Sequence, residues 1–215
     1  MFKRRAPRSY LHILARTVYP RGGWWRAVLY VVHRLRRLPD PAHKISRGIA
    51  AGVFTSFTPF FGLHFLIAAV VAWAIRGNMI AALLSTFVGN PLTFPLIATV
   101  SVELGTTILG DENAIPLGRI FGAFSNASAE LWHNLSAIFT DEVAHWGRLE
   151  NFFWHLFLPY LVGGLIPGLI AGAAAYALSR PLISAYQKAR IGRMKRGFAR
   201  RRARADKAEA AMKAE

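Results

Sequence analysis

Three long uncharged runs dominate the hydrophobic pattern of this chain. Residues 48–75 and 77–102 are separated only by Arg76, and the third run covers residues 151–179. Each run is longer than the roughly 20 apolar residues that a straight helix needs to cross the hydrocarbon core of a bilayer. The pattern therefore predicts an all-α integral membrane protein.

Helix-breaking residues interrupt the first two runs near their middles. The segment 57–62 (FTPFFG) divides the first run, and the segment 90–95 (NPLTFP) divides the second. At about 1.5 Å per residue, each arm of the first run is about 15–20 Å long, which is too short to span a core of about 30 Å. We therefore expect broken or re-entrant helices, whose free backbone groups are buried in protein or face a water-filled cavity.

Two further segments have apolar residues at helical spacing. In residues 24–38 the opposite side carries arginine and histidine, so we expect an amphipathic helix that either lies on the cytoplasmic leaflet or packs on the membrane domain. Two prolines flank Asp40, and we expect them to end this amphipathic helix. Residues 120–139 predict a second amphipathic helix, at the outer surface.

The third run contains Pro167 and several small residues. We expect Pro167 to interrupt it and Arg180-Pro181 to stop the helix on the basic side, ahead of a basic helix over residues 187–214. Gly168 and Gly172 form a G-x-x-x-G pattern, which lets helix backbones approach closely. That approach could occur within one protomer or in a homo-oligomer.

The charge distribution orients the chain. The sequence has a net charge of +16 and no cysteine; residues 1–47 and residues 180–215 each contain 12 Lys+Arg, whereas residues 48–179 contain three arginines and seven acidic residues. Basic residues that flank apolar runs indicate cytoplasmic loops and attraction to anionic lipid headgroups. A soluble nucleic-acid-binding protein is the alternative explanation of the basic composition, but no RNA-binding motif supports specific nucleic-acid recognition.

These features divide the chain into five parts and predict a multi-pass protein of the cytoplasmic membrane with both termini in the cytoplasm. The parts are a basic N-terminal segment (1–47), a membrane core (48–110), an acidic extracytoplasmic segment (111–150), a transmembrane helix (151–179) and a basic tail (180–215). An acidic segment outside requires an odd number of crossings before residue 111. We favour residues 48–75 as the re-entrant run, although the opposite assignment is also open.

Several short motifs carry a family resemblance. They are Lys44-x-x-Arg47-Gly48-x-Ala50-x-Gly52-Val53-Phe54, Phe57-x-Pro59-x-x-Gly62, Arg76-Gly77-Asn78, Asn90-Pro91-Leu92-Thr93 and Glu103-Leu104-Gly105. Over residues 40–110 the chain resembles the bacterial membrane family known as domain of unknown function 2062. The resemblance implies an inner-membrane protein with two to four apolar segments and implies no reaction. Some relatives carry a fused glycosyltransferase domain, which hints at envelope glycolipid synthesis.

The candidate substrate-binding residues lie at the two breaks. They are Thr58, Pro59, Gly62 and His64 at the first break, Asn90, Pro91 and Thr93 at the second, and Glu103 at the end of the second run. Ionisable groups at membrane depth are costly, and free helix N-termini can bind anions. His64 could serve as a proton or headgroup site, or it could be a packed histidine bonded to a backbone carbonyl. We find no motif for catalytic residues, a cofactor or a metal, so we do not expect an enzyme.

Two functions fit these observations. The first is a small permease or lipid/headgroup translocation factor that works through the paired breaks. The second is a non-enzymatic membrane scaffold for envelope glycolipid or polysaccharide synthesis.

Overall fold

The computed structural model describes residues 23–110, 116–140 and 143–214, and every regular element among them is a helix. The prediction of an all-α protein is therefore confirmed. The helices are α2 (Gly23–Arg36), α3 (Ala42–Thr55), α4 (His64–Ala74), α5 (Met79–Ser85), α6 (Phe94–Leu109), α7 (Ile120–Ala137), α8 (Gly147–Phe152) and α9 (Leu158–Ala214). The short segments η1 (Thr86–Val88), η2 (Leu117–Arg119) and η3 (Phe153–Phe157) connect to them.

Helices α3, α4 and α5 form a compact cluster of short helices. Small side chains fill its centre, where Ala51 of α3, Ala68 of α4 and Ala82 of α5 are buried together. A side chain at Gly48 would overlap the carbonyl oxygen of Asn78, and one at Gly52 would overlap that of Ala82. The two glycines therefore let α5 lie directly against the backbone of α3.

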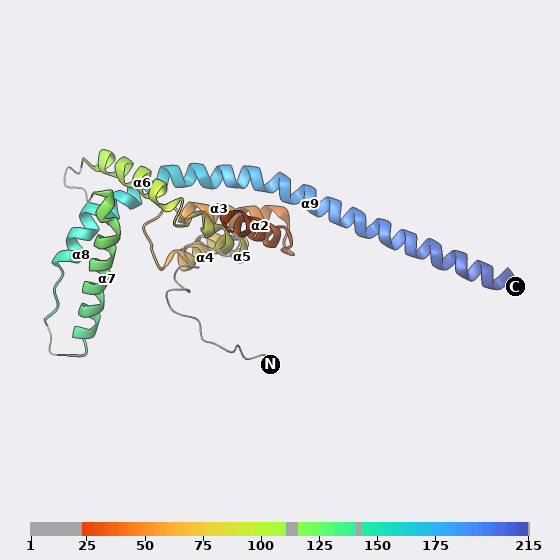
Figure 1. The fold of residues 1–215 in the computed structure, drawn as a ribbon, viewed down its shortest axis with the longest axis horizontal. Helices are drawn as coiled ribbons and strands as arrows, with labels where there is room; N and C mark the ends of the chain where they lie inside the picture. Colours follow the sequence, from red (N-terminus) through yellow and green to blue (C-terminus); the bar gives the residue numbers. More distant parts are fainter. Residues whose placement is uncertain (1–22, 111–115, 141–142, 215) are drawn as a thin grey trace.

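Helix α9 is the spine of the molecule, and α3 and α6 pack along its first half (Figure 1). Gly164 faces the carbonyl group of Phe57 at the end of α3, and Gly172 faces Ala50 nearer its start, so α3 and α9 are antiparallel. On α6, Ser101 and Gly105 face Gly163. The small residues of the third run therefore serve packing within the protomer, one of the two roles expected of them.

Helix α9 corrects two predictions, because it continues through both Pro167 and Pro181. A proline removes one hydrogen bond from a helix but does not prevent it from continuing where tertiary contacts hold it. Beyond Pro181, Ile183 is 4% exposed and packs against Ile45 and Ala81. This contact fixes the helix on the far side of the proline.

The start of α9 is less regular. Residues Phe153–Phe157 form a π-helical turn between α8 and α9, and Pro159 follows two residues later. Because proline cannot donate the hydrogen bond of a regular turn, a wider turn next to it is a common adjustment.

Helices α7 and α8 form a hairpin that projects to one side of the spine (Figure 1). The side chain of Asn134 on α7 binds the backbone of His145 on both sides, accepting from its N–H at 2.9 Å and donating to its carbonyl oxygen. The carboxylate of Glu130 accepts the N–H groups of Arg148 and Leu149 at the start of α8. Side-chain-to-backbone hydrogen bonds thus hold the two arms of the hairpin together.

Helix α2 packs on the cluster. Of the two alternatives proposed for residues 24–38, the structure shows packing on the other helices. Leu35 and Leu38 lie against the buried group of Ile45, Ala81 and Ile183. Its other face remains exposed, including Trp25 and Tyr30. The predicted end at Asp40 is correct, since α2 ends at Arg36 and α3 begins at Ala42.

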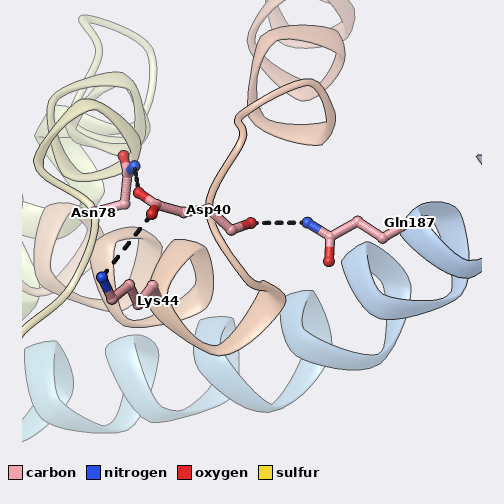
Figure 2. Close-up of polar contacts among 4 residues, drawn as sticks. All are labelled: Asp40, Lys44, Asn78 and Gln187. Carbon is pink, nitrogen blue, oxygen red and sulfur yellow. Dashed lines mark hydrogen bonds and ion pairs between the residues drawn. The ribbon is translucent and has the colours of Figure 1, made fainter. Parts of the chain in front are cut away.

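Asp40 joins three distant parts of the chain (Figure 2). Its carboxylate accepts a hydrogen bond from the amide of Asn78 and lies 4.0 Å from the ammonium group of Lys44. Its backbone carbonyl accepts a hydrogen bond of 2.9 Å from the side chain of Gln187 on α9. We call this group the Asp40 clasp; it brings the α4–α5 turn back to the start of α3.

Large apolar side chains lie on the outside of the helical body. Exposed examples are Leu66, Val70, Trp73, Ile80, Leu96, Ile166, Leu169 and Ile170. By length and composition, one helical stretch among the described residues, Gly147–Ala203, could cross a membrane; the apolar helices α4, α6 and Met79–Val88 are shorter.

Candidate functional site

The two breaks have the same local design, repeated along the chain. Helix α4 begins at His64 and helix α6 begins at Phe94, 30 residues later. Leu63 donates its N–H to the carbonyl of Phe60 in the first break, and Thr93 donates to Asn90 in the second, each at 3.1 Å. Each unit is therefore a helix, a turn and a second helix with matching hydrogen bonds.

Backbone chemistry shapes the first break. The hydroxyl of Thr58 donates to the carbonyl of Thr55 at 2.7 Å, and Pro59, which cannot donate, is fully buried. Gly62 has a φ of 81°, in the left-handed region that favours glycine. These three predicted site residues define the path of the turn.

Side chains hold the second break. The amide oxygen of Asn90 accepts from the N–H groups of Leu92 at 2.9 Å and Thr93 at 3.2 Å, and its nitrogen donates to the carbonyl of Phe87 at 3.1 Å. The hydroxyl of Thr93 donates to the carbonyl of Val88. Pro91 is exposed at the tip. Asn90 and Thr93 therefore stabilise the turn that they occupy.

The segments that lead into the two breaks meet at equivalent positions. Ser56 precedes the first break, and Thr86 precedes the second, 30 residues later. The Ser56 hydroxyl lies 3.0 Å from the carbonyl oxygen of Gly52 on its own helix and 3.3 Å from that of Thr86, so its one proton is shared between the two acceptors. Gly89 faces the side chain of Ser56, and a Cβ there would lie 3.1 Å from the Ser56 Cβ. The repeat therefore brings two polar, irregular stretches of backbone together inside an apolar body.

A cavity of about 330 Å³ adjoins the second break and lies between α2 and the helices α3 and α5. Apolar side chains from α2, α3 and α5 form most of its wall, and Ser85, Asn90 and Thr93 contribute polar groups. The Ser85 hydroxyl is buried and has no hydrogen-bond partner among the described residues. A buried hydroxyl without a partner is costly, so a rotation of the Ser85 side chain toward the cavity would gain a hydrogen bond to a ligand or water there.

An aromatic cluster surrounds the first break. The ring of Phe61 makes edge-to-face contacts with Phe94, Phe124 and Tyr160, with centroids 4.8, 4.4 and 6.0 Å away. These contacts tie the first break to α6, α7 and α9. The sequence offered the aromatic residues but no sign that Phe61 would be the point at which they meet.

The two ionisable candidates are apart from the cavity. His64 is half-buried, and the centroid of its ring lies 4.0 Å from that of the Phe65 ring. The side chain of His64 makes no hydrogen bond to a described residue. The alternative of a histidine bonded to a backbone carbonyl is therefore not what the structure shows. Glu103 is exposed on α6. Of the predicted site residues, Asn90 and Thr93 line the cavity.

Sequence reasoning missed the contribution of α2 to this site. Val28, Val31, Val32 and Leu35 close the cavity on one side. Their spacing marked an apolar stripe, but an apolar stripe does not identify the surface that it covers.

A family described as an uncharacterized protein conserved in bacteria, DUF2062, matches residues 25–192. The chain belongs to the DUF2062 family. The match extends well beyond the motifs of residues 40–110 that predicted it, and it includes both breaks, the cavity wall and the part of α9 that packs on the other helices. No curated protein and no solved structure matches this DUF2062 protein.

Proposed function

We propose that this DUF2062 protein is a small translocation factor of the bacterial cytoplasmic membrane, which passes lipid headgroups or similar polar solutes along its paired helix breaks. The contact at Ser56 and Thr86 between the segments that lead into the two breaks, beside a cavity with an unpartnered Ser85 hydroxyl, carries this proposal. Broken apolar helices whose breaks face each other are a recurring design of membrane transport sites.

The distribution of side chains supports a position within lipid. Buried residues at the helix contacts are small, as at Gly48, Gly52 and Ala82, whereas large apolar residues such as Leu66 and Trp73 point outward. In water, an exposed apolar surface of this extent would cause association; in a bilayer it contacts lipid tails.

The path of the chain supports a specific topology. Helix α4 returns along α3 to the Asp40 clasp, where Asn78 also donates its N–H to the carbonyl of Lys44 at 2.9 Å. Residues 48–75 then form a re-entrant hairpin. The second run continues through α5 and α6 to the far end of the spine, and α9 returns to the basic side, with both termini in the cytoplasm.

Single cysteines test this topology in intact cells, because the native chain has none. We expect an impermeant thiol reagent to label Ser128→Cys on α7 and to leave Arg76→Cys and Arg190→Cys protected until the membrane is permeabilised. Labelling of Arg76→Cys and not of Ser128→Cys would mean that the first run crosses the membrane, and the paired-break proposal would lose its geometric basis.

Reconstituted vesicles test the activity. The full chain should speed the exchange of a fluorescent phospholipid between leaflets, measured by dithionite quenching. Ser85→Ala removes the unpartnered hydroxyl without adding bulk at the contact of α5 with Gly52, and it should abolish the increase. Ser46→Ala removes the other buried unpartnered hydroxyl of this helix cluster, away from the cavity, and as the matched alanine control it should keep the increase. Exchange at the rate of protein-free vesicles would contradict the proposal.

A membrane scaffold is the second candidate, and the second half of α9 favours it. This part extends beyond the other helices and carries many basic residues (Figure 1). A scaffold should tolerate Ser85→Ala and fail when α9 is truncated after Gln187, whereas a translocator should show the reverse pattern. Complementation of a deletion strain with the two variants distinguishes the candidates.

A further inference from the structure

A second cavity, of about 720 Å³, lies between the start of α7 and α8. Its polar lining comes from Arg119 and Asn126 on one wall and from Arg148 and Asn151 on the other, and Gly122 and Gly147 keep it open. It lies at the end of the spine opposite the Asp40 clasp. It is therefore separate from the cavity beside the second break.

This cavity concentrates positive charge in a part of the chain where it is scarce. Residues 48–179 contain three arginines, and two of them line this cavity from elements far apart in the sequence. Neither arginine forms an ion pair with an acidic group among the described residues, where the ion pair found is that of Asp40 with Lys44. The nearby carboxylate of Glu130 is engaged by the backbone N–H groups of Arg148 and Leu149.

The arrangement of donors determines the kind of ligand. Arg119 and Asn126 are seven residues apart, two helical turns, so they share one side of their helical segment, and Arg148 and Asn151 are one turn apart on α8. A guanidinium group offers paired N–H donors that match the oxygens of an anion, and an amide adds further donors. Donors from two facing walls suit a tetrahedral group with several charged oxygens.

We propose that this cavity binds a phosphate group, carried either by a lipid headgroup or by a small soluble molecule. The proposal does not depend on translocation, because a phosphate can bind here whether or not it then moves along the breaks. It assigns a role to Arg119 and Arg148 that neither the packing of α7 on α8 nor the family description supplies.

Calorimetric titration of the full chain in an uncharged detergent tests the proposal. The probes are short-chain phosphatidylglycerol, the matching diacylglycerol without phosphate, and inorganic phosphate. We expect saturable binding of phosphatidylglycerol and none of the diacylglycerol. Binding of inorganic phosphate at a strength similar to that of phosphatidylglycerol would identify a soluble phosphate ligand. Binding of phosphatidylglycerol without binding of inorganic phosphate would identify a lipid headgroup. Both results support the site.

Substitutions locate the binding. Arg119→Gln and Arg148→Gln should each weaken it by about tenfold or more, since each removes a charge-assisted contact. Arg76→Gln, an exposed arginine in the α4–α5 turn, is the matched control and should have no effect. If an arginine variant fails to fold, Asn126→Ala with Asn151→Ala should still weaken binding several-fold. Absence of saturable binding, or equal binding by the folded arginine or asparagine variants, would overturn the proposal.

Discussion

Replacing Gly164 by alanine tests whether backbone contact between α9 and the first break holds the helices together. A Cβ at Gly164 would overlap the carbonyl oxygen of Phe57 and would lie 3.3 Å from the Ser101 hydroxyl oxygen. Because the obstacle is backbone, it cannot rotate away as a flexible side chain would. The helices would have to separate at the point where the first break meets the spine.

Two opposing terms set the size of the effect. Alanine in place of glycine in a helix interior gains up to about 1 kcal/mol, whereas overpacking of a close contact costs about 1–3 kcal/mol. Since the contact is backbone to backbone, we expect a cost near the upper end and a net loss of about 2 kcal/mol. At about 2–4 °C per kcal/mol for a chain of this size, the melting temperature should fall by about 4–8 °C.

The assay is thermal unfolding in detergent, followed by tryptophan fluorescence. Gly192→Ala is a matched control on the same helix, where a Cβ would meet nothing within 4 Å. It should leave the melting temperature unchanged or raise it. A Gly164→Ala protein as stable as the wild type would refute the close packing of α9 on the first break, and equal destabilisation by both substitutions would attribute the effect to helix geometry in general.

Two further predictions concern the turn between α4 and α5. Asp40→Ala removes the acceptor of the Asn78 amide and should lower the free energy of unfolding, measured by chemical denaturation, by about 1–2 kcal/mol. Asp40→Asn keeps an acceptor and should recover most of this loss, so equal free energies for the two variants would contradict the clasp. Arg76 has a φ of 54°, so Arg76→Gly should relieve backbone strain and raise the free energy of unfolding by up to about 1 kcal/mol. A lower melting temperature in thermal unfolding would show that the arginine side chain matters more than the backbone.

The clearest sequence predictions came from local chemistry. The prolines, glycines and polar residues of segments 57–62 and 90–95 predicted helix breaks, and the structure has turns there. The second turn ends earlier than expected, because Pro95 lies in the first turn of α6, where a missing N–H donor costs nothing. The matching 30-residue spacing of the two breaks appeared only in the structure, since hydrogen-bond geometry repeats more faithfully than side chains do.

The predictions for α9 show where local chemistry misleads. Pro167 and Pro181 are strong helix breakers in isolation, and the sequence suggested an interruption at each. The helix continues because contacts that are distant in sequence, such as Ile183 with Ile45, compensate for the missing hydrogen bonds.

The sequence by itself determined the helical class, the family, the positions of the breaks and the concentration of basic residues at the two ends, because each depends on composition or on residues within one or two turns of each other. Only the tertiary structure decided that α2 closes a cavity over Ser85 and that the segments leading into the breaks meet at Ser56 and Thr86. It also decided that Arg119 and Arg148 line the same cavity. These depend on which helix faces meet, and short apolar helices with small residues on several sides leave that choice to the packing of the whole chain.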